Sequence, residues 1–359
     1  MTEEMKNLIL SVKDLQVEFK VRGRTLKAIR NISMDFEEGK VVAIVGESGS
    51  GKSVFTKTFS GMLDANGSIT NGSIMFEGQD LAKLGSDDPK WEKIRGKKIA
   101  SVFQDPMTSL NPVRTIGDQI SEVIVKHQGK SKAEAKKEAI ELMAKVGIHE
   151  PELRFDEYPF MYSGGMRQRI VIAIALACHP RILICDEPTT ALDVTIQAQI
   201  IRLIKDLSEE YHFTTIYITH DLGVVANVAD VVAVMYAGQI IEYGLVDEIF
   251  YDPRHPYTWG LLSSLPQLGI KGEDLFAIRG TPPSLFEEVK GDAFAPRSDY
   301  AMKIDYVKEP PFFKVTDTHY AKTWLLDPRA PKVEPPLAVR ELHKRMPLMT
   351  AKGGVFGER

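Results

Sequence analysis

A glycine-rich stretch early in the chain has the residue types and spacing of a phosphate-binding loop. Glycines let the backbone turn tightly, so that successive N–H groups point at phosphate oxygens, and a following helix adds its positive N-terminal end. Lys52 would reach the β- and γ-phosphates, and the Ser53 hydroxyl would ligate Mg²⁺. A plain Gly/Ser-rich surface loop is the alternative, which the apolar run 41–45 before it and the helix-like run 54–63 after it disfavour. The residues of the stretch are Gly46, Glu47, Ser48, Gly49, Ser50, Gly51, Lys52 and Ser53.

Two acids and a histidine follow apolar runs further along the chain. Asp186 ends the apolar run 181–186, where an acid at a strand tip holds Mg²⁺ through water, and Glu187 follows it directly. Glu187 could polarise an attacking water as a general base. His220 comes after the run 214–219 and would touch a γ-phosphate there, although a lone histidine at a strand end is usually structural.

A second glycine-containing segment and an upstream aromatic residue extend this chemistry. Ser163, Gly164 and Gly165 begin an apolar helical run and so form a second anion site at a helix N-terminus. Because one nucleotide needs only one such cradle, this site either covers the γ-phosphate bound by another chain or is a simple helix cap. Phe19 precedes the phosphate loop, where a ring could stack on a base or belong to the core.

The elements around these residues predict an α/β fold. Short alternating runs at 9–12, 15–19 and 32–36 favour an antiparallel sheet, whereas buried runs at 41–45, 99–103, 181–186 and 214–219 favour a parallel one. A helix is predicted over 195–207, and a last strand pair over 231–235 and 239–243. Residues 113–160 have helical periodicity, with a capping box from Ser131 to Glu134. Prolines crowd the chain after residue 251, which predicts an irregular extension.

Composition sets the class of protein. The 359 residues are 43% hydrophobic and 26% charged, as in a soluble globular protein, and the net charge of −4 without a dense Lys/Arg tract gives no support to a nucleic-acid partner. Neither a signal peptide nor an apolar run long enough to cross a bilayer is visible, so we expect the protein in the cytoplasm. Cys178 and Cys185 lie in apolar surroundings and are interpreted as small buried thiols.

In this order the segments resemble the motifs of the ATP-binding cassette (ABC) ATPases, over roughly residues 8–250. Gly46–Ser53 resembles the Walker A motif, 181–187 the Walker B motif, Gln104 the Q-loop, 162–166 the signature motif, 191–193 the D-loop and His220 the H-loop. Met166 and Tyr162 depart from the usual glutamine and leucine of the signature, but Ser163 and both glycines are intact.

The resemblance implies a P-loop NTPase core with an antiparallel β subdomain, an α-helical subdomain at about 105–165 and a C-terminal extension over 251–359. It implies an ATP hydrolase that forms a head-to-tail dimer with two ATP molecules between the subunits. Phe19 would then stack on the base, Glu187 would be the general base, and His220 would contact the γ-phosphate. Gln104 would sense Mg²⁺ held with Ser53 and Asp186. Asp193, Ser163, Gly164 and Gly165 would complete the nucleotide site of the other subunit.

The extension resembles the C-terminal region of oligopeptide and dipeptide importer ATPases, at 254–258, 265–266 and 278–285. This implies a peripheral subunit on the cytoplasmic face of the cell membrane, powering oligopeptide uptake. Its partners would be a second ATPase subunit, for which a paralogue is favoured over a second copy, two membrane permease subunits and an extracellular peptide-binding protein. A dipeptide or nickel importer is the nearest alternative. A soluble ABC protein of DNA repair or translation is a more distant one, and neither the coiled coil nor the tandem cassette that it requires is visible.

The extension also departs from its relatives in one respect. Segment 291–302 resembles the family's cluster-binding segment, but the four expected cysteine positions hold Asp292, Ser298, Asp305 and Thr323. An iron–sulfur cluster needs thiolate ligands. We therefore predict no cluster, with this region held by packing alone.

Overall fold

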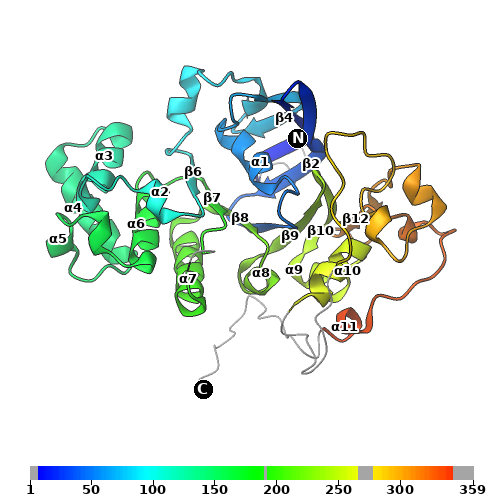
Figure 1. Cartoon of the computed structure of the whole chain (residues 1–359). Coiled ribbons are helices and arrows are strands. Elements are labelled where there is room, and N and C mark those ends of the chain that lie inside the picture. Colours follow the sequence, from blue (N-terminus) through cyan, green and yellow to red (C-terminus); the bar gives the residue numbers. More distant parts are fainter. Residues whose placement is uncertain (1–6, 190–191, 266–277, 343–359) are drawn as a thin grey trace.

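The computed structural model describes residues 7–189, 192–265 and 278–342, and these form two sheets flanked by helices. Figure 1 shows the larger sheet in the middle of the molecule, the helices α3 to α6 on one side and the C-terminal extension on the other. The smaller, antiparallel sheet covers the larger sheet near helix α1. The predicted α/β fold with an antiparallel subdomain and a helical subdomain is confirmed.

The larger sheet has a parallel centre because its strands are apolar on both faces. Its order is β11-β12-β10-β9-β3-β8-β7-β6, with parallel pairing from β9 to β6 and antiparallel pairing from β9 to β11. All five residues of β3 are buried, as expected for a central parallel strand. The strands are β3 (Val41–Val45), β6 (Ile99–Val102), β7 (Ile182–Asp186), β8 (Thr214–Thr219), β9 (Val231–Tyr236), β10 (Gln239–Leu245), β11 (Phe313–Lys314) and β12 (Tyr320–Ala321).

Alternate residues of β3 enter two different cores. Val42 and Ile44 pack toward the antiparallel sheet and the rings of Phe55 and Phe59. Val41, Ala43 and Val45 pack on the other face, with residues of the helices α6 (Gly164–Leu176) and α7 (Val194–Tyr211). Helix α1 (Lys52–Lys57) and its 3₁₀ turn (Thr58–Ser60) thus lie between the sheets. This helix ends earlier than the run 54–63 predicted, because the chain tightens into the 3₁₀ turn and reverses at Gly61 (φ 60°).

The antiparallel sheet has the order β2-β1-β4-β5 and is more continuous than the sequence predicted. The two short runs at 9–12 and 15–19 belong to one strand, because register shifts between Val12 and Val17 absorb the break in their alternation. Asp14 lies at this irregularity with φ 49°. The strands are β1 (Leu8–Val21), β2 (Arg24–Glu37), β4 (Gly67–Phe76) and β5 (Gln79–Asp80).

The predicted helical segment between β6 and β7 is confirmed. The Ser131 side chain accepts a hydrogen bond from Glu134 N and the Glu134 side chain accepts from Ser131 N, which is the predicted capping box. The predicted helix 195–207 is longer and runs over Val194–Tyr211. The helices are α2 (Pro106–Ser109), α3 (Ile116–Gln128), α4 (Lys132–Lys145), α5 (Pro151–Arg154), α6 (Gly164–Leu176), α7 (Val194–Tyr211) and α8 (Leu222–Val228), with 3₁₀ turns at Leu81–Lys83, Pro89–Lys93 and Pro159–Met161.

The extension is mostly irregular, as predicted, but it also contributes two strands to the larger sheet. β12 pairs with β10 and β11 pairs with β12, so that the end of the chain builds onto the sheet begun by the phosphate-loop strand. Helix α9 (Val246–Tyr251) leads into the extension. The helices of the extension are α10 (Pro256–Ser263) and α11 (Leu337–Arg340), with 3₁₀ turns at Ala295–Arg297, Lys303–Tyr306 and Trp324–Leu326. Within the described part of the chain, none of the helices has the length and apolar character needed to cross a membrane.

Candidate nucleotide site

The phosphate loop joins the carboxyl end of β3 to the start of α1, and two of its glycines are required by their surroundings. A Cβ at Gly46 (φ 152°) would lie 2.1 Å from the Met235 carbonyl oxygen. A Cβ at Gly51 (φ 102°) would lie 2.9 Å from the Ala28 carbonyl oxygen. The loop can therefore take this path only with glycine at both positions.

Lys52 lies inside the loop that it follows. Its Nζ donates to the carbonyl oxygens of Gly46 at 2.7 Å and Glu47 at 2.9 Å. Burial lowers the pKa of Lys52, and the nearby carboxylates of Glu187, Asp186 and Glu47 oppose this shift. The ammonium is therefore fixed where phosphate oxygens would replace the loop carbonyls as its acceptors.

The loop faces the ends of neighbouring strands across a hollow of about 710 Å³. Ser53 Oγ donates to Asp186 Oδ1 at 3.0 Å, which brings the hydroxyl and carboxylate of the two motifs into direct contact. Burial raises the pKa of Asp186, and the hydrogen bond from Ser53 opposes this shift. The lining residues are Leu26, Ala28, Ser48, Gly49, Gly51, Lys52, Ser53, Val54, Gln104, Asp186, Glu187, Ser284, Leu285 and Phe286.

Glu187 and His220 meet at the ends of β7 and β8. His220 Nδ1 lies 3.1 Å from Glu187 Oε1, while Glu187 N donates to the Ile218 carbonyl. Glu187 has φ 48°, a left-handed conformation that is unfavourable for a residue other than glycine and that often occurs at functional sites. Glu187 thus lines the hollow and contacts the imidazole from one position.

Other predicted site residues lie outside this hollow. Ser163 caps α6 by accepting from Met166 N at 3.3 Å, with Gly164 and Gly165 in the first turn, and Asp193 caps α7 by accepting from Ile196 N at 3.0 Å. Ser163, Gly164 and Asp193 are exposed, so these groups are open to a second molecule. Ala191 lies outside the described residues.

Phe19 is also absent from the lining of the hollow. Only 8% of the residue is exposed, and a Cβ at Gly67 would lie 2.6 Å from its ring. Phe19 could stack on a base or belong to the core, and in this structure its surroundings are those of a core residue.

The sequence analysis missed the contribution of the extension to the phosphate loop. The Arg297 guanidinium donates to both carboxylate oxygens of Glu47, and Glu47 N donates to the Tyr257 hydroxyl at 2.8 Å. Ser284, Leu285 and Phe286 line the hollow itself. The phosphate loop and the extension are far apart in the sequence, so no local periodicity connects them. The one signal in the sequence is Glu47, an acid inside a phosphate-binding loop, which suggests a cationic partner.

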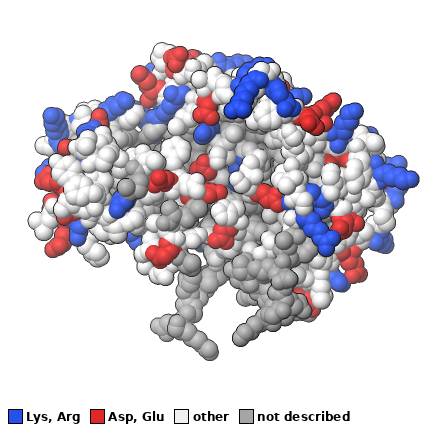
Figure 2. Space-filling view, viewed as in Figure 1, with Lys and Arg blue, Asp and Glu red and all other residues white. Residues whose placement is uncertain are grey.

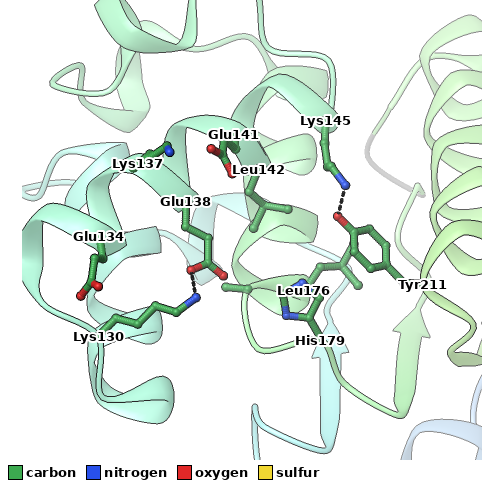
Figure 3. A pocket seen from close by; sticks show the side chains of 11 residues that line it. Lys130, Glu134, Lys137, Glu138, Glu141, Leu142, Lys145, Leu176, His179 and Tyr211 are labelled. Carbon is green, nitrogen blue, oxygen red and sulfur yellow. Dashed lines mark hydrogen bonds and ion pairs between the residues drawn. The ribbon is translucent and has the colours of Figure 1, made fainter.

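A second hollow, of about 450 Å³, lies between α4 and the ends of α6 and α7 (Figure 3). Lys130 pairs with Glu138, and Lys145 donates to the Tyr211 hydroxyl at 2.5 Å. The phosphate loop contributes no residue to this lining, and Lys145 also pairs with Glu210 outside it. We interpret it as a solvated surface lined by charged side chains.

The positions at which relatives were expected to carry cysteines hold oxygen-bearing side chains that cap turns. Asp292 accepts from Phe294 N at 2.9 Å, Asp305 from Met302 N at 2.6 Å, Ser298 from Tyr300 N at 3.2 Å and Thr323 from Leu325 N at 3.2 Å. Asp292 N also donates to the Asp305 carbonyl at 2.7 Å. Among the described residues, no set of three or more His, Cys, Asp or Glu side chains is arranged to hold a metal ion.

The two cysteines are free thiols. Cys185 is buried in β7, and Cys178 is half-buried after α6. Burial raises the pKa of Cys178 to about 11. Burial also raises the pKa of Cys185, so both thiols are protonated at neutral pH.

A phosphate loop with an acid pair and a histidine at the ends of adjacent parallel strands defines a P-loop ATPase of the ATP-binding cassette class. Residues 29–190 match the family described as ABC transporter, and residues 241–304 match the family described as Oligopeptide/dipeptide transporter, C-terminal region. The chain belongs to the ABC transporter family, among the ATP-binding proteins with this C-terminal region. It binds ATP and is an ATP hydrolase.

Individual relatives match nearly the whole chain. The oligopeptide transport ATP-binding protein AmiE of Streptococcus pneumoniae serotype 4 is 66% identical, covering 96% of this chain and 97% of that protein. The oligopeptide transport ATP-binding protein OppD of Bacillus subtilis is 58% identical over 94% of each. The dipeptide transport ATP-binding protein DppD of Lactococcus lactis subsp. cremoris is 57% identical over 91% of this chain and 93% of that protein.

A solved structure agrees in the fold. The ATP-binding cassette MJ0796, in a dimeric post-hydrolysis state bound to ADP and Pi, has a TM-score of 0.59 and 29% identity. The match covers 66% of this chain and 98% of the MJ0796 chain, so about one third of this chain has no counterpart in MJ0796.

Proposed function

We propose that this chain is the ATP-hydrolysing subunit that powers the uptake of oligopeptides across the cytoplasmic membrane. The observation that carries the proposal is the single hollow that brings Lys52, Ser53, Gln104, Asp186 and Glu187 together, with His220 against Glu187. Oligopeptides are favoured as the cargo because AmiE and OppD are described as oligopeptide transport proteins. The proposed domains are residues 8–250 and the extension 251–359.

In this proposal the groups of the hollow divide the binding and hydrolysis of ATP between them. Lys52 holds the β- and γ-phosphates, Glu187 takes a proton from the attacking water, and His220 orients Glu187 and contacts the γ-phosphate. The contact between the Ser53 hydroxyl and the Asp186 carboxylate suits Mg²⁺, which prefers oxygen ligands and shares them with substrate phosphates. Gln104 completes this set, and the ion would neutralise charge on the transferred phosphoryl group.

The exposed caps of α6 and α7 favour assembly with a second ATPase subunit. Ser163, Gly164, Gly165 and Asp193 are not in the lining of this chain's own hollow, and Ser163, Gly164 and Asp193 are exposed. In a head-to-tail pair these four residues would complete the nucleotide site of the partner subunit. We propose that this partner is a paralogue of the chain. The dimeric state of the MJ0796 cassette supports such pairing.

The other proposed partners are two membrane permease subunits and an extracellular peptide-binding protein, with this chain on the cytoplasmic face of the membrane. A hollow of about 420 Å³ beside Gln104 supports contact with a permease helix. Apolar and polar side chains both line it, and the apolar ones suit a helix that packs into the hollow. The apolar side chains are Phe103, Val123, Val171, Ile174 and Ala175, and the polar ones are Ser101, Thr108, Ser109 and His127. On the face drawn in Figure 2, positive and negative side chains are interspersed, without the broad basic area that a nucleic-acid partner favours.

Peptide uptake by cells carrying Glu187→Gln tests the cargo. Growth would be measured on tetra- to octapeptides as the sole source of a required amino acid, and in parallel on dipeptides and at limiting nickel. We expect loss of growth on the longer peptides only. The 57% identical DppD makes dipeptide import the second candidate, which a defect confined to dipeptides would favour, whereas a defect only at limiting nickel would contradict both.

A further inference from the structure

The C-terminal extension closes one side of the nucleotide hollow. The backbone N–H of Lys27 on β2 donates to the Leu285 carbonyl at 3.0 Å, which holds the segment Ser284–Phe286 against the antiparallel sheet. Pro282 and Pro283, which precede this segment, line a small cavity against Glu47, Ser48 and Gly49 of the phosphate loop. The extension thus covers the loop on its outer side and reaches the hollow from there.

The hollow has a polar part and an apolar part. The polar part consists of the phosphate loop with Gln104, Asp186 and Glu187, and the phosphates of ATP belong there. The apolar part consists of Leu26 and Ala28 on β2, together with Leu285 and Phe286 of the extension. With the phosphates at the loop, the apolar part is the area of this hollow that suits an adenine base.

Phe286 is the aromatic ring in this lining. Arg24 Cζ lies 4.9 Å from its centroid, which fixes the ring by a cation–π contact beside Leu26. Phe19, the aromatic residue that the sequence predicted for stacking, pairs with Leu26 across the β1–β2 hairpin but is 8% exposed and covered by β4. Phe286 is half-buried and lines the hollow, so its ring is the more accessible of the two.

We propose that the extension supplies the adenine-binding wall of this ATPase, with Phe286 as the ring that the base contacts. This proposal rests on the proposed use of the hollow for ATP. Stacking of an aromatic ring on a base is strong enough to matter, and its loss weakens binding by about 5- to 100-fold. The extension would then take part in nucleotide affinity.

Binding of ADP and of inorganic pyrophosphate by the full chain, both with Mg²⁺, tests the proposal, because only ADP carries a base. Phe286→Ala should weaken ADP binding about 5- to 100-fold and leave pyrophosphate affinity within twofold. Phe286→Trp should restore ADP affinity. Phe312→Ala is the matched control, since Phe312 is another ring of the extension under a cation, Lys322, but lies outside the hollow. It should leave both affinities unchanged.

Several results would overturn the proposal. Unchanged ADP affinity in Phe286→Ala, with a selective loss in Phe19→Leu, would give the base to Phe19. An equal loss for ADP and pyrophosphate would mean that Phe286 only supports the phosphate loop. Tighter ADP binding would mean that the segment obstructs the site. Absence of ADP and pyrophosphate binding in the unmodified chain would instead contradict the proposed function itself.

Discussion

Arg297 donates two hydrogen bonds to the Glu47 carboxylate, from Nη1 at 2.7 Å and from Nη2 at 3.0 Å, across 250 residues of chain. The Arg297 side chain is 5% exposed, and its Nη1 also donates to the Tyr236 hydroxyl. Hydrogen bonds from Arg297 to Glu47 raise the pKa of this guanidinium above its usual value, so it is charged at any pH of interest. The pair fastens the extension to the phosphate loop.

Removing this pair should destabilise the protein and weaken ATP binding. Arg297→Ala leaves the Glu47 carboxylate without its bidentate partner, and Arg297→Lys cannot replace two parallel hydrogen bonds. In a double-mutant cycle of Arg297→Ala and Glu47→Gln, measured by urea denaturation, we expect a coupling of about 1–3 kcal/mol. Additive effects would show that the contact does not contribute to stability.

Glu187→Gln should retain ATP binding and lose turnover by roughly 10²-fold or more, because a neutral amide cannot take the proton of the attacking water. Phosphate release at saturating ATP measures turnover, and equilibrium binding measures affinity. Glu209→Gln, an exposed position on α7, is the control and should hydrolyse ATP normally. Turnover near the unmodified rate in Glu187→Gln would remove this residue as the base.

Lys52→Ala should raise the Kd for ATP by roughly tenfold or more, because charge-assisted hydrogen bonds to the phosphates are lost. Lys40→Ala has the same change in charge at the opposite end of β3, where the side chain is exposed, and should bind ATP as before. Calorimetric titration measures both. Equal affinities in the two variants would contradict a phosphate-binding loop.

The free energy of unfolding should depend on pH through the Asp292 carboxylate. Burial raises its pKa to about 6 from an ordinary value of 3.8, so the folded state holds this proton more tightly than the unfolded state. The resulting stabilisation is complete below about pH 4 and is lost as the pH rises through 6. Relative to the unmodified protein, Asp292→Asn should therefore gain up to about 3 kcal/mol in the free energy of unfolding between pH 4 and 7.

This comparison cancels titrating groups that both proteins share and that do not contact Asp292. His255, whose Nε2 lies 3.7 Å from Asp292 Oδ2, has its pKa lowered to about 4 by burial and acts in the opposite direction. A constant difference for Asp292→Asn would show that its carboxylate is not desolvated in the folded protein.

Glu242 is the buried acceptor that joins β10 to the extension. Its carboxylate accepts from the backbone N–H groups of Arg254 and His255, and His319 Nε2 lies 2.8 Å from Oε1. Glu242 and His319 are fully buried, so Glu242→Ala leaves several polar groups unpaired and should cost about 3–5 kcal/mol. Glu334→Ala breaks an exposed ion pair with Arg340 and should cost less than about 1 kcal/mol. Similar losses in urea denaturation would contradict this role of Glu242.

Local patterns in the sequence predicted much of the fold. The predicted buried runs correspond to β3, β7 and β8, and the predicted capping box at Ser131 lies at the start of α4. These elements could be predicted because their signals depend only on residues close together in the sequence. The spacing of the glycines, acids and histidine predicted which groups take part in the site, and the structure adds that most of them share one hollow.

Contacts between distant segments could not be predicted in the same way. Nothing near Glu47 indicates Arg297, and β11 and β12 are two residues each, too short to give a period. The continuity of β1 depends on irregular pairing with β2 and β4, which is a property of the assembled sheet. The position of Phe19 likewise depends on Gly67, the first residue of β4.

The pairing of β12 with β10 has a practical consequence for work with shortened forms of this protein. A fragment that ends near residue 250, at the length of a cassette such as MJ0796, would leave β10 as an unpaired edge with free backbone donors and acceptors. Such edges recruit strands from other molecules and promote aggregation. In the chain described here the sheet instead ends at the short β11, which carries Lys314, and both features discourage pairing between molecules.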